Sequence, residues 1–177
     1  MTAILVTGRP GSGKTTLVRA VIKALEAPAG GFFTRELRDV SGSRTGFEIV
    51  TLDGATATLA SIDIDGPRVG RYGVDIAALD RVGVPAIATA IEHGRIVVID
   101  EIGKMELLST TFQRAVIEAV RLHRVIFGSI IQAAHPFADE LKAQPDVFVH
   151  ELNAGNREQL RGLLEAQLLG ALGRFSV

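Results

Sequence analysis

AILVTGRPGSGKTT, at residues 3–16, is the stretch that decides the fold. Its short apolar run Ala3–Val6 predicts a β-strand, because the run is too short for a buried helix. GRPGSGKT follows and fits G-x-x-x-x-G-K-[ST], the pattern of a phosphate-binding P-loop. Apolar residues then recur at helical spacing, at positions 17, 18, 21, 22 and 25. The loop is therefore expected between a strand and a helix, which is the setting that this motif requires.

The positions of this loop have separate expected contacts. Glycines let the backbone curl until successive N–H groups face a phosphate, and the helix N-terminus adds partial positive charge. We expect residues 11–14 to bind the β-phosphate through the main chain, Lys14 to bridge the β- and γ-phosphates, Thr15 to bind Mg²⁺ and Thr16 to reach the α-phosphate. The nucleotide-binding residues predicted here are Gly8, Arg9, Pro10, Gly11, Ser12, Gly13, Lys14, Thr15 and Thr16. The predicted ligand is a nucleoside triphosphate.

A second motif, RIVVIDEIGKMEL at residues 95–107, supplies two carboxylates. Its four consecutive apolar residues, Ile96–Ile99, predict a central parallel strand that is buried on both faces. Asp100 and Glu101 then fall at the carboxyl edge, where open α/β sheets bind ligands. Asp100 fits the Walker B role of holding the Mg²⁺ shell opposite Thr15. Glu101 is predicted to bind near the γ-phosphate, orient an attacking water and accept its proton.

The residues after these carboxylates extend the predicted site. Ile102 and Gly103 are assigned to nucleotide binding, and Gly103 would let the backbone approach the phosphates. Lys104 is a candidate cation for the γ-phosphate, and a surface ion pair with Glu106 is the alternative. The predicted catalytic residues are Glu101, Lys14 and Lys104. Arg68 and Arg71 are further candidates for a transition-state cation.

The loop NAGNR, at residues 153–157, has two compatible interpretations. Asn156 suits the N-cap of a closing helix. Alternatively, Asn156 hydrogen-bonds the base while Arg157 stacks its guanidinium on the ring, so both are predicted nucleotide-binding residues. Ser129 and Gln132 end another expected strand, where a polar side chain can sense the γ-phosphate.

The periodicity of the whole chain predicts a three-layer α/β fold, with a mostly parallel sheet, helices on both faces and an antiparallel hairpin extension. The expected elements are a helix over 14–26, an antiparallel meander over 31–62, a loop over 66–72, helices over 76–93 and 107–121, a strand over 124–131, a short helix or lid-like loop over 135–142, a strand over 147–150 and a closing helix to about 172. We find no repeat or linker, so residues 1–177 are predicted to form a single P-loop NTPase domain.

Composition argues against several classes of protein. No segment approaches the ~18 apolar residues of a membrane span, and a first strand at residue 3 leaves no room for a signal peptide. The chain has no cysteine, which suits the cytoplasm. Net charge is −1 without a Lys/Arg run, so no nucleic-acid footprint is visible. We expect a cytoplasmic monomer.

The chain resembles the THEP1 family of nucleoside-triphosphatases in stretches that follow one another over nearly its whole length: GRPGSGKTT, GGFFTRELR, GFEIVTLDG, RVGRYGVD, VVIDEIGKMEL and the late Asn156-Arg157. The resemblance implies a RecA-like P-loop fold in which the Walker B Asp is followed by a catalytic Glu. It also implies that the strand 124–131 separates the P-loop strand from the Walker B strand. Glu36, Arg38 and Arg68 fall inside the motifs of the family.

The resemblance further implies Mg²⁺-dependent hydrolysis of ATP, GTP, CTP and UTP to the diphosphate and phosphate, with loose base specificity. A nucleotide or nucleoside kinase is the alternative, with Arg35, Arg38 and Arg68 around an acceptor pocket. Such kinases usually carry an Arg-rich lid, whereas residues 134–143 contain no arginine. A GTPase switch would need an [NT]-K-x-D stretch, and none is present.

Overall fold

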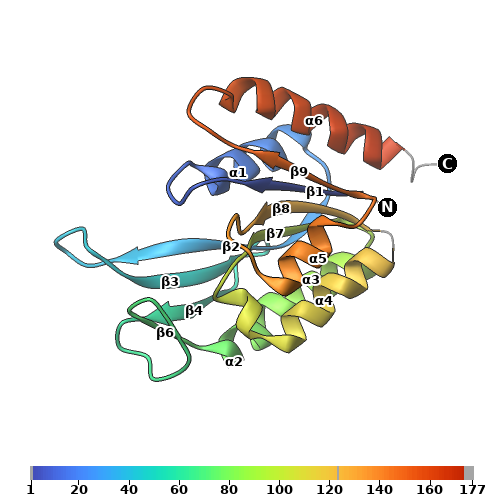
Figure 1. The fold of residues 1–177 in the computed structure, drawn as a ribbon. Helices are drawn as coiled ribbons and strands as arrows, with labels where there is room; N and C mark the ends of the chain where they lie inside the picture. Colours follow the sequence, from blue (N-terminus) through green and yellow to red (C-terminus); the bar gives the residue numbers. More distant parts are fainter. Residues whose placement is uncertain (1, 123, 174–177) are drawn as a thin grey trace.

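The computed structural model describes residues 2–122 and 124–173. Within these residues, nine strands form one sheet in the order β5-β6-β4-β3-β2-β7-β8-β1-β9 (Figure 1). The strands are β1 (Thr2–Thr7), β2 (Ala29–Arg38), β3 (Arg44–Thr51), β4 (Thr56–Ser61), β5 (Arg68–Val69), β6 (Tyr72–Val74), β7 (Ile96–Ile102), β8 (Val125–Ile130) and β9 (Val147–Glu151).

The parallel part of the sheet consists of β2, β7, β8, β1 and β9. β8 pairs with β1 on one side and with β7 on the other, so it separates the P-loop strand from the strand that ends in the two carboxylates. This confirms the strand order that the family resemblance implied. The consequence is that the phosphate loop and the acidic motif lie at the same carboxyl edge.

Helices cover both faces of this sheet, which confirms the three-layer prediction (Figure 1). One apolar cluster joins α1 (Lys14–Leu25) and α6 (Arg157–Gly173) to one face, and a second joins α3 (Val84–Glu92), α4 (Thr110–Arg121) and α5 (Pro136–Lys142) to the other. Successive residues of β7 alternate between the clusters, with Val97 and Ile99 in one and Ile96 and Val98 in the other. A central strand must bury both faces, and this is why it reads as an unbroken apolar run. Among the described residues, no helix is long and apolar enough to cross a membrane.

The predicted helix over 76–93 is helical throughout but has three parts: α2 (Ile76–Ala78), the π-helical turn η1 (Leu79–Gly83) and α3. Pro85 lies in the first turn of α3, where its missing N–H group costs least. The Val84 N–H donates to the Leu79 carbonyl, which widens the turn before the proline. The predicted helix from residue 107 begins later, at Thr110, because the Ser109 hydroxyl accepts from the Phe112 N–H and caps α4.

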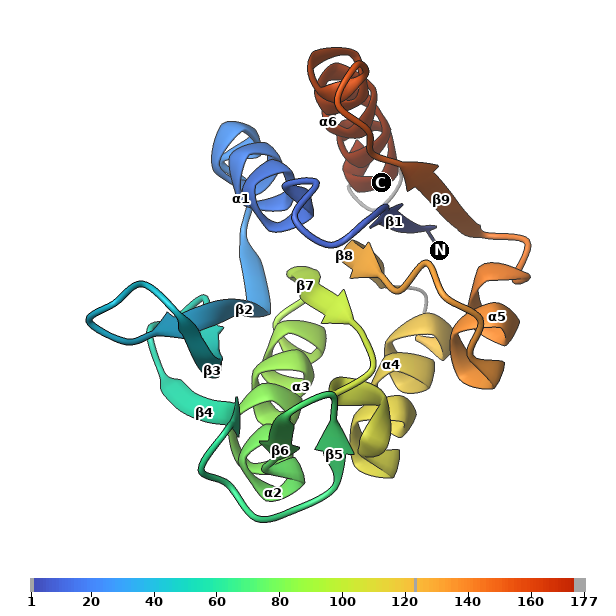
Figure 2. The same ribbon diagram turned by 60° about the vertical axis from the view of Figure 1, so that its left-hand side comes forward.

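The antiparallel extension is continuous with the parallel sheet. β2 pairs in parallel with β7 over Ala29–Phe33 and then in antiparallel with β3 over Phe32–Arg38. β4, β6 and β5 follow β3 and curl around the end of the α2–α3 segment (Figure 2). The predicted loop over 66–72 is partly wrong, because it contains β5 and the start of β6. Strands of two and three residues are too short for their alternation to be visible in a sequence.

Candidate active site

The P-loop connects β1 to α1, which confirms the predicted strand–loop–helix setting. Gly13 stands at the N-cap of α1 with φ 90°, a left-handed conformation that favours glycine. A Cβ at this position would also collide with the guanidinium of Arg157. Because glycine has no side chain to cap the helix, the first N–H groups of α1 remain available to a phosphate.

Lys14 links the P-loop to the acidic motif. Its ammonium donates to the Gly8 carbonyl over 3.1 Å and lies 3.7 Å from Glu101 Oε2. Only 12% of the Lys14 side chain is exposed. The cation that is predicted to bind phosphate therefore already contacts the predicted base.

Asp100 is 1% exposed at the carboxyl end of β7. The Ser129 hydroxyl donates to Asp100 Oδ1, whereas Oδ2 is buried and accepts no hydrogen bond from the described part of the chain. Burial raises the pKa of the Asp100 carboxyl, and the Ser129 and Thr15 hydroxyls and the Lys14 ammonium lower it. Ser129, which was expected to sense the γ-phosphate, therefore binds the Walker B carboxylate in this structure.

The Asp100 carboxylate and the Thr15 hydroxyl suit a hard divalent cation such as Mg²⁺. A buried carboxylate oxygen without a partner needs a cation or water, and Mg²⁺ prefers oxygen ligands. Residues 2–122 and 124–173 contain no group of three or more His, Cys, Asp or Glu that could hold a metal by itself. A Mg²⁺ site of the kind usual in NTP enzymes needs only one or two protein oxygens, joined by substrate phosphates and water.

Glu101 follows directly and is half-buried, with 36% of its side chain exposed. Burial raises the pKa of the Glu101 carboxyl, Lys14 lowers it, and the neighbouring Asp100 raises it again. A raised pKa makes a carboxylate a better proton acceptor near neutral pH. The structure thus places a partly accessible carboxyl group, that of the predicted base, beside the P-loop lysine.

The surface ion pair considered between Lys104 and Glu106 does not form. Glu106 is 3% exposed, in the 3₁₀ turn η2 (Glu106–Leu108). Burial, together with the charges of Glu101 and Asp100, raises the pKa of the Glu106 carboxyl to about 8. Lys104 is exposed and forms no ion pair with any described residue. Glu106 was not predicted as a site residue, because an acid four positions from a strand end usually lies in solvent.

The loop before α6 brings Arg157 to the P-loop. Its Nη2 donates to the Ser12 carbonyl over 2.6 Å and its Nη1 to the Gly13 carbonyl over 3.5 Å. The Asn156 side chain instead stabilises its own loop, where it accepts from the Asn153 N–H and donates to the Glu151 carbonyl. The Asn156 carbonyl accepts the first helical bond of α6, from the Leu160 N–H, which is the N-cap position.

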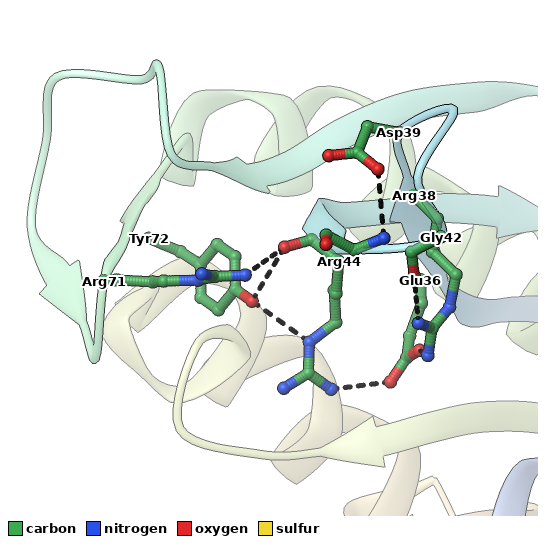
Figure 3. Close-up of polar contacts among 8 residues, drawn as sticks. Glu36, Arg38, Asp39, Gly42, Arg44, Arg71 and Tyr72 are labelled. Carbon is green, nitrogen blue, oxygen red and sulfur yellow. Dashed lines mark hydrogen bonds and ion pairs between the residues drawn. The ribbon is translucent and has the colours of Figure 1, made fainter.

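The arginines of the extension contact one another's backbones and Glu36 (Figure 3). Arg38 and Arg44 both pair with Glu36, and the Arg44 Nε donates to the Tyr72 hydroxyl over 3.0 Å. Arg71 donates to the Arg44 carbonyl. These contacts join the β2–β3 hairpin to the β5–β6 hairpin.

Arg68 and Arg35 complete this arrangement. Arg68 donates to the Arg71 carbonyl over 2.8 Å, and Arg35 forms an ion pair with Glu48 across the β2–β3 pair. Gln132, the second candidate phosphate sensor, donates to Glu151 over 3.1 Å. The three arginines proposed for an acceptor pocket, Arg35, Arg38 and Arg68, thus all have partners within the extension.

Known proteins resemble this chain over most of its length. A family model described as NTPase matches residues 3–164. The Nucleoside-triphosphatase THEP1 of Thermotoga sp. (strain RQ2) is 42% identical over 158 residues, which cover 89% of this chain and 90% of the relative. The Cancer-related nucleoside-triphosphatase of Homo sapiens is 36% identical over 174 residues, covering 89% of this chain and 91% of the relative.

Solved structures have the same fold. The crystal structure of THEP1 from the hyperthermophile Aquifex aeolicus superposes with a TM-score of 0.86 at 31% identity, and covers 94% of this chain and 99% of that chain. The solution structure of a human cancer-related nucleoside triphosphatase gives a TM-score of 0.81 at 33% identity, with 95% and 97% covered. The chain therefore belongs to the THEP1 family of nucleoside-triphosphatases.

Proposed function

We propose that the chain catalyses Mg²⁺-dependent hydrolysis of nucleoside 5′-triphosphates to the diphosphate and phosphate, with Glu101 activating the attacking water. Its relatives are named nucleoside-triphosphatases, and the chain is an NTP hydrolase of that family. The assignment of Glu101 as the base that activates water rests on the position of this residue. It follows the buried Asp100 at the carboxyl edge of the sheet and lies 3.7 Å from the Lys14 ammonium.

Substrate binding is assigned to the P-loop. The N–H groups of residues 11–14 bind the β-phosphate, and the Lys14 ammonium bridges the β- and γ-phosphates. The Thr15 hydroxyl and Asp100 would hold Mg²⁺, with Ser129 fixing the Asp100 side chain. When bound, Mg²⁺ would neutralise part of the phosphate charge.

Glu101 provides the base for the reaction. A water held between Glu101 and the γ-phosphorus forms a new P–O bond while the bond to the β,γ-bridging oxygen breaks, and its proton passes to the Glu101 carboxylate. The nucleoside diphosphate leaves with the bridging oxygen. Lys14 stabilises the charge that develops on the transferred group, and the exposed Lys104 is proposed as a second cation there.

Loose base specificity follows from the kind of contact proposed for the base. The Arg157 guanidinium is held on the P-loop through two carbonyls, and a planar cation stacks on any base. Asn156 is proposed to lie next to the ring. We also propose that residues 1–177 form one domain, which acts as a cytoplasmic monomer.

The experiment that tests this function is Glu101→Gln, because the amide keeps the size and hydrogen bonding of the side chain but is not a base. The nucleotide Kd, from titration with a fluorescent nucleotide, should stay close to that of the wild type. Phosphate release should fall by about 10²–10⁴-fold, the usual contribution of a positioned base. Glu118→Gln, at an exposed position of α4, is the matched control and should change neither quantity.

Retained phosphate release by Glu101→Gln would remove Glu101 from the mechanism. The kinase alternative is tested in the same assay by adding nucleosides and nucleoside monophosphates as acceptors. Transfer to an acceptor at a rate above phosphate release would favour that alternative.

A further inference from the structure

Glu106 is a buried carboxyl group for which the proposed mechanism has no use. Among the described residues, Asp100 and Glu106 are the two acidic side chains that are buried. Asp100 is explained by its place opposite Thr15. Burial of a carboxyl group costs several kcal/mol unless it is paired or neutral. No ion pair forms between Glu106 and another residue of the described chain, so its burial requires a reason.

The geometry around Gly103 shows what Glu106 faces. A Cβ placed on Gly103 would lie 2.5 Å from Glu101 Oε1 and 2.9 Å from Glu106 Oε2. The carboxyl groups of Glu101 and Glu106 therefore border the same small space, which exists because residue 103 has no side chain. Glu106 comes from η2 and Glu101 from β7, so this turn folds back onto the end of the strand.

The charges around the Glu101 and Glu106 carboxyl groups decide which of the two favours the protonated form. Two carboxyl groups that border one buried space resist ionising together, which favours a proton on one of them. Glu101 faces the Lys14 cation, whereas Glu106 is the more buried and faces the negative charges of Glu101 and Asp100. The N–H groups of Gly103 and Glu106 only partly offset this effect. Glu106 is therefore the member of the pair that favours the protonated form, in which it can donate a hydrogen bond.

We propose that Glu106 is a positioning residue for hydrolysis, whose carboxyl group, across the space beside Gly103, holds the Glu101 carboxylate in the orientation that activates water. This inference rests on the proposed role of Glu101. A glutamate side chain has many rotamers, and a base loses efficiency when it is free to leave the line of attack. Contact with a buried acid on a packed turn restricts the Glu101 carboxyl without removing its charge.

The test compares Glu106→Leu with Glu106→Gln. The Leu variant removes the polar contact and keeps the volume, and we expect kcat to fall by about 10–100-fold with KM within roughly twofold. Its Tm should not fall, because an apolar side chain of similar size avoids the cost of burying a polar carboxyl group. The Gln variant keeps a hydrogen-bond donor and should retain kcat within about threefold. Leu107→Val, in the same buried turn, is the control and should leave kcat unchanged.

A double-mutant cycle with Glu101→Gln separates this inference from the proposed function. If Glu106 acts through Glu101, Glu106→Leu should lower kcat by less than about threefold in the Glu101→Gln background. An equal loss in both backgrounds, or wild-type kcat in Glu106→Leu, would overturn the inference. Wild-type turnover in Glu101→Gln alone would overturn the proposed function instead.

If Glu106→Leu fails to fold, the pH dependence of kcat in Glu106→Gln tests the proposal instead. Ionised Glu106 would repel Glu101, so wild-type kcat should fall above pH 8. Glu106→Gln has no charge to gain and should lack this fall. Identical profiles for the two proteins would show that Glu106 only fills space.

Discussion

The Lys14 ammonium lies 3.7 Å from Glu101 Oε2, so the cation of the P-loop and the proposed base are neighbours. One substitution should therefore affect both binding and chemistry. Lys14→Ala removes a charged partner of the phosphates, which should weaken nucleotide binding by roughly 10–100-fold. It should also lower kcat by about 10²–10³-fold, because a transition-state donor is lost.

Titration with a fluorescent nucleotide and phosphate release measure these two effects of Lys14→Ala. Lys23→Ala, on the exposed side of the same helix, is the control and should behave as the wild type. Normal ATP hydrolysis by Lys14→Ala would show that the P-loop assignment is wrong.

Gly103→Ala should disturb the base without unfolding the protein. The φ of Gly103 is not positive, so the backbone accepts alanine, but the new Cβ would lie 2.5 Å from Glu101 Oε1. The flexible carboxyl group has to move, and kcat should fall by about 10–100-fold while nucleotide Kd changes little. Gly162→Ala, whose Cβ would meet no atom within 4 Å, serves as the control in kinetics and in thermal unfolding. Unchanged kcat in Gly103→Ala would mean that Glu101 works equally well in a second position.

Glu106 should make the protein less stable as pH rises. Its pKa is raised from 4.5 to about 8 in the folded protein, so the folded state holds a proton that the unfolded state releases between these values. Stability from this group is complete below pH 4.5 and is lost as pH rises through about 8. At pH 9, Glu106→Gln should therefore exceed the wild type by at least about 1 kcal/mol in unfolding free energy, or roughly 2–4 °C in Tm.

Thermal unfolding of both proteins from pH 5 to pH 9 measures this difference. The carboxyl pKa values of Asp100 and Glu101 are also raised. Both proteins contain these two residues, so the difference in Tm between the proteins reports mainly on residue 106. Parallel Tm curves would show that Glu106 does not change its ionisation over this range.

Base tolerance should depend on Arg157. Stacking by a guanidinium does not distinguish one ring from another, so ATP, GTP, CTP and UTP should be hydrolysed within roughly tenfold of one another, about 1.4 kcal/mol. Arg157→Ala should raise KM for all four by a similar factor, because it removes the stacking surface and the bonds to the Ser12 and Gly13 carbonyls. Arg161→Ala, which breaks only a surface pair with Glu165, is the control. A thousandfold preference for one base would favour a nucleotide switch over a general hydrolase.

The parts of the fold that a local pattern encodes were predictable from the sequence. The strand Ala3–Val6, the P-loop and its helix are contiguous, and the apolar run Ile96–Ile99 identifies a strand buried on both faces. Contacts between distant segments were not predictable in the same way. Ser129 reaches Asp100 across 29 residues, and Arg157 reaches Ser12 across 145. No periodicity records such pairs, since they depend on the order of strands and on the packing of loops.

The burial of Glu106 next to Glu101 could not be predicted from the sequence. Glu106 follows a lysine and a methionine at the end of a strand, and an acid in such a place is usually solvated. Its burial results from the η2 turn, which directs Leu107 into the core and takes Glu106 inward with it. A turn of three residues has no period that would reveal this direction.

The place of β8 between β1 and β7 sets the width of the reaction space. Neighbouring strands are about 4.8 Å apart, so two strands separated by a third stand roughly 10 Å from each other. This distance separates the end of β1, where the P-loop is proposed to bind phosphate, from the end of β7, where Glu101 lies. This separation places the P-loop and Glu101 on either side of β8 at one edge of the sheet, where the proposed mechanism needs the γ-phosphate and its water. The strand order thus keeps the P-loop and the proposed base one strand apart, an arrangement consistent with a phosphate and a water lying between them.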